Sequence, residues 1–328
     1  MKKLSIIVPA YNEEEVIELF YKKLKEVIDK ITERYKYEII FVDDGSKDNT
    51  LDKLKKLREN DKNINIISFS RNFGKEAGIY AGLKNANGDM VVLLDADLQH
   101  DPENIPQMIK YIEEGYDTVT TIRNRKGESK VKSWFSNMFY RVMSGNKEIK
   151  LKKGSQDFRM MTRQVVQAIL DLKEYNRFSK GIFSWVGFKT KYIEVENKKR
   201  AAGKTKWSFM KLFRYAIEGI TSFSVTPLKI ATISGIIISI ISIIFAIMIV
   251  MQTLIMGKDV PGYASTITSV LFMGGIQLIT IGILSEYVGK IYLEIKGRPQ
   301  YIVKEKITGE KNEENNGRIQ KWDKKPSN

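Results

Sequence analysis

Two pairs of aspartates near the start of the chain have the residue type and spacing that metal-assisted chemistry requires. Asp43 and Asp44 follow one apolar run, and Asp95 and Asp97 follow another. Carboxylate oxygens are ligands that Mg²⁺ or Mn²⁺ prefers, and such an ion is able to bridge them to a diphosphate. Aspartates also cap helices, which is the role we expect for Asp101. Because both pairs follow predicted strands, we favour a metal and diphosphate site over two sets of helix caps.

The composition narrows the kinds of site that the chain is able to build. Its 328 residues include no Cys and a single His, His100. Disulfide frameworks, thiolate nucleophiles and cysteine zinc sites are therefore excluded. A serine–histidine triad or a multi-histidine metal site would have to be built around His100, which we expect to belong to the turn after the second acidic pair. Any metal chemistry is therefore carboxylate chemistry.

Alternating strands and helices are predicted to position these acids. Apolar runs at residues 4–10, 37–44, 64–69 and 89–94 are typical of buried strands. Helical patterns separate them, and between residues 16 and 31 apolar residues recur every three or four positions. This alternation predicts an α/β fold, a mostly parallel sheet with helices on both faces, whose ligands bind at the carboxyl ends of the strands. Both acidic pairs lie at such ends.

Two long uncharged stretches predict a membrane anchor. Residues 230–251 and 264–285 each hold 22 residues without a charge. At about 1.5 Å per residue, each helix would span about 33 Å, enough for the hydrocarbon core of a bilayer. We therefore predict two transmembrane helices of a cell-membrane protein rather than two core helices of a soluble domain. The loop between them carries only Lys258 and Asp259, so the positive-inside rule places both termini and the first 228 residues in the cytoplasm.

The positive charge is concentrated in two segments. The chain holds 54 Lys and Arg against 39 Asp and Glu, a formal charge of +15, and residues 123–153 and 189–214 contribute +8 and +7 of it. Basic segments near a membrane hairpin indicate anionic partners such as lipid head groups or diphosphates. No helix-turn-helix, zinc-finger or RNP-type pattern accompanies the charge, so we predict that nucleic acid is not a partner.

Several motifs, in this order along the chain, resemble those of family 2 glycosyltransferases with the GT-A fold. They are SIIVPAYNEE, VDDGSKDNT, RNFGKEAGIYAGL and DADLQHDPE. Further segments, GSQDFRMM, RFSKGIFSWVGFKT, RAAGKTKWS and EYVGKIYLEIKGRPQYIV, make the chain similar to polyprenyl-phosphate glycosyltransferases related to dolichol-phosphate mannose synthase. The resemblance covers nearly all of residues 4–303, and the two-span hairpin favours the bacterial, undecaprenyl-phosphate type.

The resemblance implies roles for residues that bind the donor. The residues that match the family's nucleoside site are Pro9, Ala10, Tyr11, Glu13 and Asp44, and beside them we assign Asp43, Lys75 and Asp95 to donor binding. The residues that match the family's metal and diphosphate site, which would hold Mg²⁺ or Mn²⁺, are Asp95, Asp97 and Gln99.

The resemblance also implies roles in the chemistry. Arg123 falls where the family places an arginine that reaches a substrate phosphate. Arg200 and Lys206 match an RxxGxSK motif, in which Thr205 here replaces the serine and keeps its hydroxyl. These two cations also fit a juxtamembrane patch that attracts anionic lipid. Asp157 matches the acidic residue often proposed as a base.

The activity that the resemblance implies is an inverting transfer of a sugar from a nucleotide donor to a polyprenyl phosphate at the cytoplasmic membrane face. We favour glucose from UDP-glucose, and UDP-GlcNAc, other UDP-sugars and GDP-mannose stay open. A divalent ion with Arg and Lys would neutralise the leaving diphosphate. Because the acceptor phosphate is already anionic, a strong general base is largely unnecessary, and Asp157 is expected chiefly to orient sugar or acceptor.

Two other functions fit parts of the pattern. A processive polysaccharide synthase would share the first half of the chain, but such enzymes carry a Gln-x-x-Arg-Trp motif and usually more spans, and neither is present. A non-catalytic scaffold that binds nucleotide sugar or lipid would not need intact acids at both strand ends. A homo-oligomer is possible, since Gly274, Gly275 and Gly282 would permit close helix packing within the hairpin or between subunits.

These features divide the chain into four parts. Residues 1–206 are predicted to form a cytoplasmic GT-A domain. Residues 207–228 have the pattern of an amphipathic helix in the membrane interface, although a surface helix packed on the domain also fits. Residues 229–296 hold the two spans, and residues 297–328, charged and poor in apolar side chains from Lys304 onwards, are predicted to be a largely disordered cytoplasmic tail.

Overall fold

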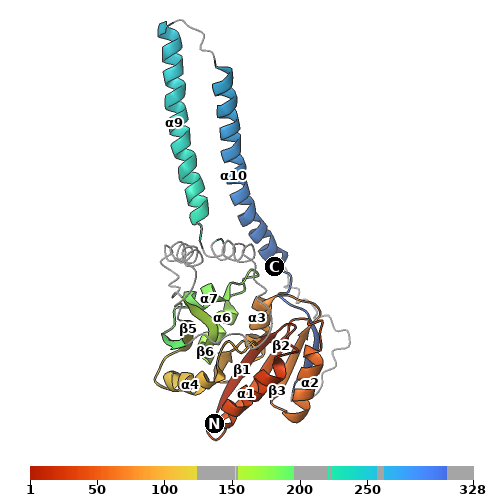
Figure 1. The fold of residues 1–328 in the computed structure, drawn as a ribbon. Coiled ribbons are helices and arrows are strands. Elements are labelled where there is room, and N and C mark those ends of the chain that lie inside the picture. The colour runs from red at the N-terminus through yellow and green to blue at the C-terminus, as the bar shows by residue number, and fades with distance from the viewer. Residues whose placement is uncertain (124–151, 153, 196–220, 222–223, 257–261, 309–328) are drawn as a thin grey trace, which may run out of the picture. The chain divides into compact units, whose positions relative to one another are not determined.

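The computed structural model describes residues 1–123, 152, 154–195, 221, 224–256 and 262–308 (Figure 1). The chain divides into two compact units. The first comprises Met1–Ser208 together with Pro299–Asn328, and the second comprises Phe209–Arg298.

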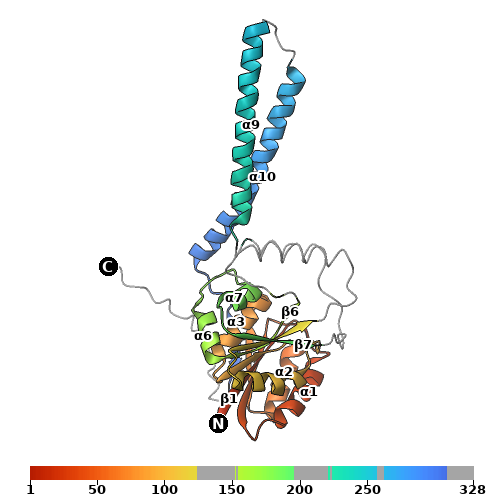
Figure 2. The ribbon, with the colours of Figure 1, turned by 90° about the vertical axis from the view of Figure 1, so that its left-hand side faces the viewer.

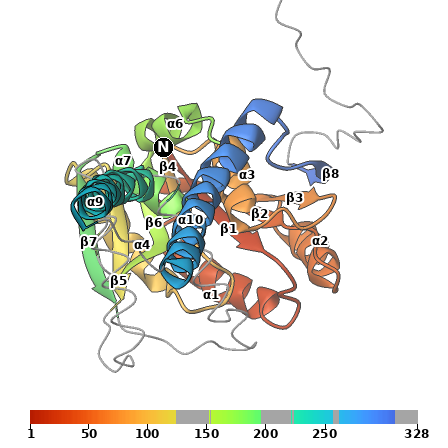
Figure 3. The same cartoon turned by 90° about the horizontal axis from the view of Figure 1, so that it is seen from above.

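A mixed sheet of eight strands, counted within the described residues, forms the centre of the first unit. Its strands lie in the order β7-β5-β6-β4-β1-β2-β3-β8, which Figure 3 shows from above. Neighbouring strands from β4 through β1 and β2 to β3 are parallel, as are β5 and β7, whereas β6 and β8 are antiparallel to the strands they pair with. The strands are β1 (Lys2–Ala10), β2 (Tyr35–Asp43), β3 (Ile64–Phe69), β4 (Met90–Leu93), β5 (Thr118–Arg123), β6 (Ser155–Thr162), β7 (Thr190–Val195) and β8 (Val303–Ile307).

Helices cover both faces of this sheet (Figure 2). On one face lie α1 (Ile17–Asp29), α2 (Thr50–Asn60), the short 3₁₀ helix η1 (Pro102–Asn104) and α4 (Ile105–Glu113). On the other lie α3 (Lys75–Asn85), α6 (Arg163–Asp171) and α7 (Ser179–Trp185). The predicted α/β class, a mostly parallel sheet between two helical layers, is confirmed.

The local sequence explains the central elements. In β1 the side chains of Leu4, Ile6, Ile7 and Val8 are all fully buried, as expected for a strand covered on both faces. The apolar residues of α1 recur every three or four positions and face the core; they are Ile17, Phe20, Leu24, Val27 and Ile28.

Glycine lets α3 lie close to β1. A methyl group added at Gly82 would come within 2.2 Å of Ile7 Cγ2, a distance that no real contact allows. At Gly78, one turn earlier, the nearest atom would be Pro9 Cβ at 3.4 Å, an ordinary contact. The close approach therefore depends on Gly82, and it fixes the start of α3 beside the end of β1.

The segment after the second long helix returns to the sheet, which differs from the expected tail. Residues 303–307 form β8 and pair antiparallel with β3. The Tyr301 ring stacks on Phe69, with ring centroids 4.8 Å apart. The expectation of a largely disordered segment from residue 297 is therefore wrong for this stretch, and residues 309–328 lie outside the described part. Three consecutive charged residues stand between Val303 and Ile307, and this high charge obscured the edge strand in the sequence.

Within the described residues, the second unit consists of two long helices. They are α9 (Thr226–Met256) and α10 (Tyr263–Lys296), and their stretches Thr226–Gln252 and Ser265–Lys296 are long and apolar enough to cross a membrane. None of their most apolar windows is buried within the chain. Such a large exposed apolar surface is unlike a core helix and fits a lipid-facing one.

Two expectations about this unit concern the glycines of α10 and the predicted interfacial helix. Among the described residues, a methyl group added at Gly274, Gly275 or Gly282 would meet no atom within 4 Å, so these glycines do not bring the two helices close together. Packing of these glycines between subunits stays a prediction. Most of the predicted interfacial helix at 207–228 falls on residues 207–220, which lie outside the described residues, and α9 already begins at Thr226.

Candidate active site

Four of the predicted donor-binding residues lie where β1 ends. Pro9 and Ala10 are the last two residues of β1, and Tyr11 and Glu13 follow in the loop that leads to α1. The backbone N–H of Glu13 donates to Thr50 Oγ1 at 2.9 Å, which ties this loop to the start of α2. The carboxyl ends of β1 and β2 therefore form one edge, where the fold class places its ligands.

Asp43 supports this edge from inside the protein. Its Oδ1 accepts from the Ser46 backbone N–H at 3.1 Å, and its Oδ2 accepts from Ser68 Oγ at 2.7 Å. The residue is only 1% exposed. Because both oxygens are engaged and covered, the structure favours a role in holding the loop over the predicted contact with the donor.

Asp44 joins the end of β2 to the start of α3. Its carboxylate accepts from the backbone N–H groups of Phe73 at 2.6 Å and Gly74 at 2.9 Å. Burial disfavours the charged carboxylate and raises the pKa of Asp44 to about 6, although the two N–H donors oppose the shift. The contact fixes the residues directly before Lys75.

The sheet register brings two distant acids together. β4 and β6 are antiparallel with Leu93 opposite Arg159, so continuing the register by two residues sets Asp95 opposite Asp157. The Lys75 ammonium lies between them, 2.8 Å from an Asp95 oxygen and 2.7 Å from Asp157 Oδ2. A cation thus bridges two carboxylates at the carboxyl end of β4.

This charged triad remains open to solvent on one side. The side chains of Lys75, Asp95 and Asp157 are 44%, 22% and 19% exposed. Burial by itself would lower the pKa of Lys75, but the Asp157 and Asp95 carboxylates raise it above its ordinary value. Burial would raise the pKa of Asp157, but Lys75 and Lys180 hold it well below its usual range. Both groups are therefore charged at neutral pH.

Glu76, the residue after Lys75, attaches α7 to α3. Its Oε2 accepts from the Ser179 backbone N–H at 3.0 Å and from the Ser179 hydroxyl. Burial raises the pKa of this carboxyl group. Through this contact the first residue of α7 is held beside the triad.

The Asp-x-Asp segment forms a tight turn after β4. Asp97 Oδ1 accepts from the Gln99 backbone N–H at 3.1 Å. Leu98 between them has φ +57°, in the left-handed region that side chains other than glycine seldom adopt. His100 follows in the turn, as expected, with its ring stacked on Phe158 and its centroid 5.6 Å away. Burial lowers the pKa of His100, so it is neutral at pH 7.

The acids at this turn fit a divalent ion. Asp95 already binds a cation, the Lys75 ammonium, and His100 Nδ1, which has no hydrogen-bond partner among the described residues, lies 3.8 Å from Asp95 Oδ2. Carboxylate oxygens are hard ligands that suit Mg²⁺ and Mn²⁺. Within the described ranges no cluster of three or more His, Asp or Glu side chains could hold an ion. Further ligands would have to come from elsewhere, and a substrate diphosphate would supply them.

The side chains of three predicted site residues lie outside the described part of the structure. Arg123 is the last residue of β5, and its side chain is outside the described part of the structure. Arg200 and Lys206 also lie outside the described residues. Their predicted roles stay predictions.

Sequence reasoning missed two cations that lie near Asp157. Arg159 stands two residues after Asp157 on β6, and therefore on the same face of the sheet. Lys180, in the first turn of α7, is close enough to lower the pKa of Asp157. Period-two spacing along the segment from residue 155 could have pointed to Arg159, but no local signal pointed to Lys180.

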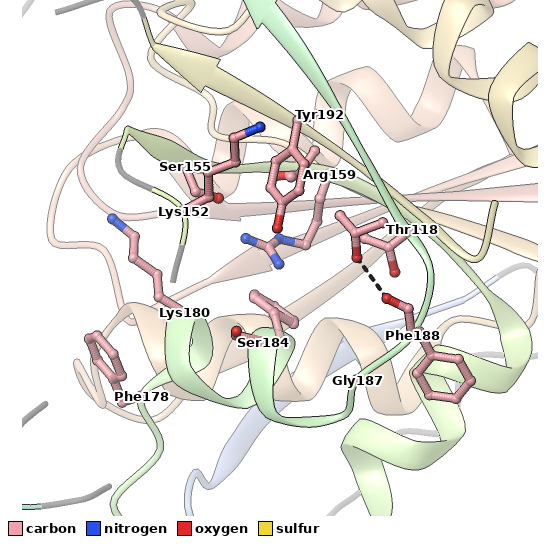
Figure 4. A pocket seen from close by; sticks show the side chains of 13 residues that line it. Thr118, Lys152, Ser155, Arg159, Phe178, Lys180, Ser184, Gly187, Phe188 and Tyr192 are labelled. Atoms are coloured by element: carbon pink, nitrogen blue, oxygen red, sulfur yellow. Dashed lines mark hydrogen bonds between the residues drawn. The ribbon is translucent and has the colours of Figure 1, made fainter. Parts of the chain in front are cut away.

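A pocket of about 290 Å³ opens between β5, β6, β7 and α7. Figure 4 shows the Arg159 guanidinium pointing into it between Tyr192 on β7 and Ser184 on α7. Lys152 and Lys180 also line it. This pocket is separate from the edge formed by β1 and β2.

Comparison with known proteins gives a consistent result. The model of the family described as glycosyl transferase family 2 matches residues 5–170. A putative glycosyltransferase of Bacillus subtilis, CsbB, is 46% identical over 302 residues, which cover 92% of this chain and 91% of that protein.

Two further proteins are similar to this chain. The bactoprenol glucosyl transferase of Shigella phage SfII is 42% identical over 308 residues, covering 94% of this chain and 99% of its own length. Among solved structures, glucosyl-3-phosphoglycerate synthase from Mycobacterium tuberculosis has a TM-score of 0.45 and 17% identity, and the match covers 68% of this chain and 79% of that one.

Proposed function

The chain belongs to glycosyl transferase family 2, and from this membership we propose that it transfers glucose from UDP-glucose to undecaprenyl phosphate. The observation that carries the acceptor and the sugar is the 42% identity, over almost the whole of both chains, to a bactoprenol glucosyl transferase. Glycosyltransferase activity follows from membership of the family. The identities of the donor nucleotide and of the acceptor lipid do not follow from it, and they are what we propose.

The geometry at the strand ends supports this activity. The nucleoside would lie at the edge formed by Pro9, Tyr11 and Asp44, and the diphosphate would lie beside Asp95 and Asp97. Lys75 already bridges the Asp95 and Asp157 carboxylates, and because its side chain is 44% exposed, its ammonium is open to a third anion when substrate enters. Fixed cations of this kind stabilise negative charge that develops on a leaving diphosphate.

A divalent ion, Mg²⁺ or Mn²⁺, would be held by Asp95 and Asp97, with Gln99 next to them. When bound, such an ion supplies electrostatic stabilisation of the diphosphate. Asp157 is a poor proton acceptor, because Lys75 and Lys180 hold its pKa below the usual range. Its role in this proposal is to position Lys75 and the sugar, and the anionic acceptor attacks without a strong base.

We place the reaction at the cytoplasmic face of the cell membrane. The hairpin of α9 and α10 supplies two candidate spans. β8, which follows the hairpin, pairs with β3, which precedes it, so an even number of crossings keeps both flanks on one side. The cationic flanks and the 252–263 loop, which carries only Lys258 and Asp259, support the cytoplasm as that side.

The test measures release of nucleoside diphosphate by the purified full chain in detergent. The protein is supplied with Mg²⁺ or Mn²⁺ and a panel of UDP- and GDP-sugars, with and without undecaprenyl phosphate. We expect release of UDP from UDP-glucose only when the lipid is present, with a glucose-bearing lipid as product. EDTA should abolish the release, and excess Mg²⁺ or Mn²⁺ should restore it.

Two outcomes would overturn the proposal. Polymer formation without lipid would indicate a processive polysaccharide synthase. Nucleotide binding without turnover of any donor would indicate a membrane scaffold. Turnover with the lipid but a different sugar would keep the acceptor and correct the donor.

A further inference from the structure

The pocket beneath α7 has a positive lining and lies apart from the nucleotide edge. Three cations line it, Lys152, Arg159 and Lys180, and none of the described side chains that line it is acidic (Figure 4). A cavity lined by one sign of charge and bounded by protein concentrates ions of the opposite sign. The pocket therefore suits an anion.

Among the side chains that line the pocket, Arg159 gives the strongest evidence for an anionic ligand. It is 4% exposed, and its guanidinium packs over the Phe183 ring with 3.7 Å between the guanidinium carbon and the ring centroid. Its Nη2 donates to the Gln156 carbonyl at 3.0 Å, but its buried Nε has no hydrogen-bond partner among the described residues. Burial lowers the pKa of Arg159 to about 10, so it is still charged at pH 7. Asp157 and Glu76 are close enough to act on this charge, but the buried Nε donor is costly to leave unpaired unless a ligand satisfies it.

The rest of the lining indicates the chemical class of the anion. Hydroxyl groups come from Ser155, Ser184 and Tyr192, and they add donors for several oxygens around one centre. Apolar surface lies beside them; Phe178 and Phe183 contribute to it. A volume of about 290 Å³ holds more than a bare phosphate ion. Cations next to aromatic rings fit a phosphate monoester whose ester group is apolar.

We propose that this pocket binds the phosphate of the acceptor lipid, with Lys152, Arg159 and Lys180 as its cationic ligands. The proposal rests on the proposed function and names the residues that recognise its second substrate. Asp157 and Arg159 lie on the same face of β6, and Arg159 and Lys180, which line the pocket, are both close enough to Asp157 to lower its pKa. A phosphate held by these two cations would therefore lie near the acid that contacts Lys75.

The step balances without a base. An oxygen of the acceptor's phosphate dianion forms a bond to the anomeric carbon of the sugar, and the bond from that carbon to the diphosphate oxygen breaks. The electron pair of the broken bond leaves with the nucleoside diphosphate, which gains one negative charge. The acceptor phosphate loses one negative charge as it becomes a diester. No proton is transferred.

The experiment measures binding to the full chain in detergent, using farnesyl phosphate, inorganic phosphate and UDP as separate probes. The variants are Lys180→Gln and Lys152→Gln, which remove one charge each at partly exposed positions, and Arg159→Lys, which keeps the charge. Lys191→Gln is the matched control. Lys191 neighbours Tyr192 on β7, but its ammonium lies over the rings of Tyr111 and Tyr116, outside the pocket.

We expect Lys180→Gln and Lys152→Gln each to weaken farnesyl phosphate binding about tenfold or more, as the loss of one charge-assisted contact would. Arg159→Lys should weaken it also, because a single ammonium cannot replace the planar guanidinium. UDP binding should not change in any variant, and Lys191→Gln should bind all probes as the wild type does. In turnover, the KM for undecaprenyl phosphate should rise while the KM for the sugar nucleotide stays the same.

Several results would overturn the proposal. Unchanged farnesyl phosphate binding in both lysine variants would do so even if Arg159→Lys failed to fold. Inorganic phosphate that binds as tightly as farnesyl phosphate would indicate a site for free phosphate rather than for lipid. If the wild type did not glucosylate the lipid at all, the proposed function would fail by itself. If it did so with a KM for lipid that no pocket variant changes, only this inference would fail.

Discussion

Lys75 connects the donor edge with Asp157, and this arrangement changes what each acid is expected to contribute. Asp95 and Asp157 share the same ammonium, at 2.8 Å and 2.7 Å. Asp97 does not share it in the structure, and the family resemblance gives it to the metal and the diphosphate. The loss of Asp157 would leave Lys75 paired to Asp95, whereas the loss of Asp97 would, under the proposed metal assignment, remove a ligand from the ion.

We therefore expect Asp97→Asn to lower kcat/KM about 100-fold or more, the scale seen when one electrostatic contact to a transition state is removed. Asp157→Asn should lower it less, because its main effect is on the position of Lys75 and the sugar. UDP release in the presence of undecaprenyl phosphate measures both. An equal or greater loss at Asp157 would contradict this order and favour a general base.

Asp44 predicts a dependence of stability on pH. Its folded-state pKa of about 6 lies above the ordinary 3.8, so the folded chain holds the proton more tightly than the unfolded chain does. Its stabilising contribution is complete below about pH 4 and is lost as the pH rises through about 6. At about 1.4 kcal/mol per pKa unit the loss approaches about 3 kcal/mol.

The measurement compares thermal unfolding of the wild type and Asp44→Asn between pH 4.5 and 7.5. The unfolding temperature of the wild type should fall relative to that of the variant as the pH rises, since Asn does not titrate. Parallel curves would show that Asp44 has the same pKa in the folded and unfolded chains.

At the scale of elements, the packing of α3 on β1 positions Lys75. Gly82→Ala should destabilise the protein by about 1–3 kcal/mol, because the new methyl group overlaps Ile7 in a fully packed core. Gly78→Ala should be neutral or stabilising by up to about 1 kcal/mol, because alanine favours the helix and meets only an ordinary contact with Pro9. Chemical denaturation of the two variants checks the difference, and similar losses at both glycines would contradict it.

Local patterns predicted the first four strands and the helices between them, because each of these elements carries its own periodicity. Residues 64–69 form β3 within the limits that the pattern indicated. The position of β8 was not predictable in this way, because Phe69 and Val303 pair across more than two hundred residues and no short segment records that pairing. The local patterns also placed the donor-side acids at their strand ends, because each acid directly follows its own strand. They did not predict the contact between Lys75 and Asp157, because these residues are 82 positions apart in the sequence.

At the scale of the whole molecule, the absence of cysteine makes the membrane topology directly testable. We expect Lys258→Cys, in the loop between α9 and α10, to react with a membrane-impermeant thiol reagent added to intact cells. Lys62→Cys, at an exposed position between α2 and β3, should react only after the cells are lysed. The opposite pattern would place the sheet outside the cytoplasm.

The return of the chain from the hairpin to the sheet has a consequence for how the protein is made. A ribosome completes β1 to β7 and both long apolar helices before it makes residues 303–307. Until then β3 has an unpaired edge, which is the kind of surface that joins to other chains. Tyr301 and β8 cover that edge in the finished protein. The edge of β3 in the nascent domain therefore stays open until the two apolar helices have been made. Completion of the sheet thus depends on synthesis of the membrane segment.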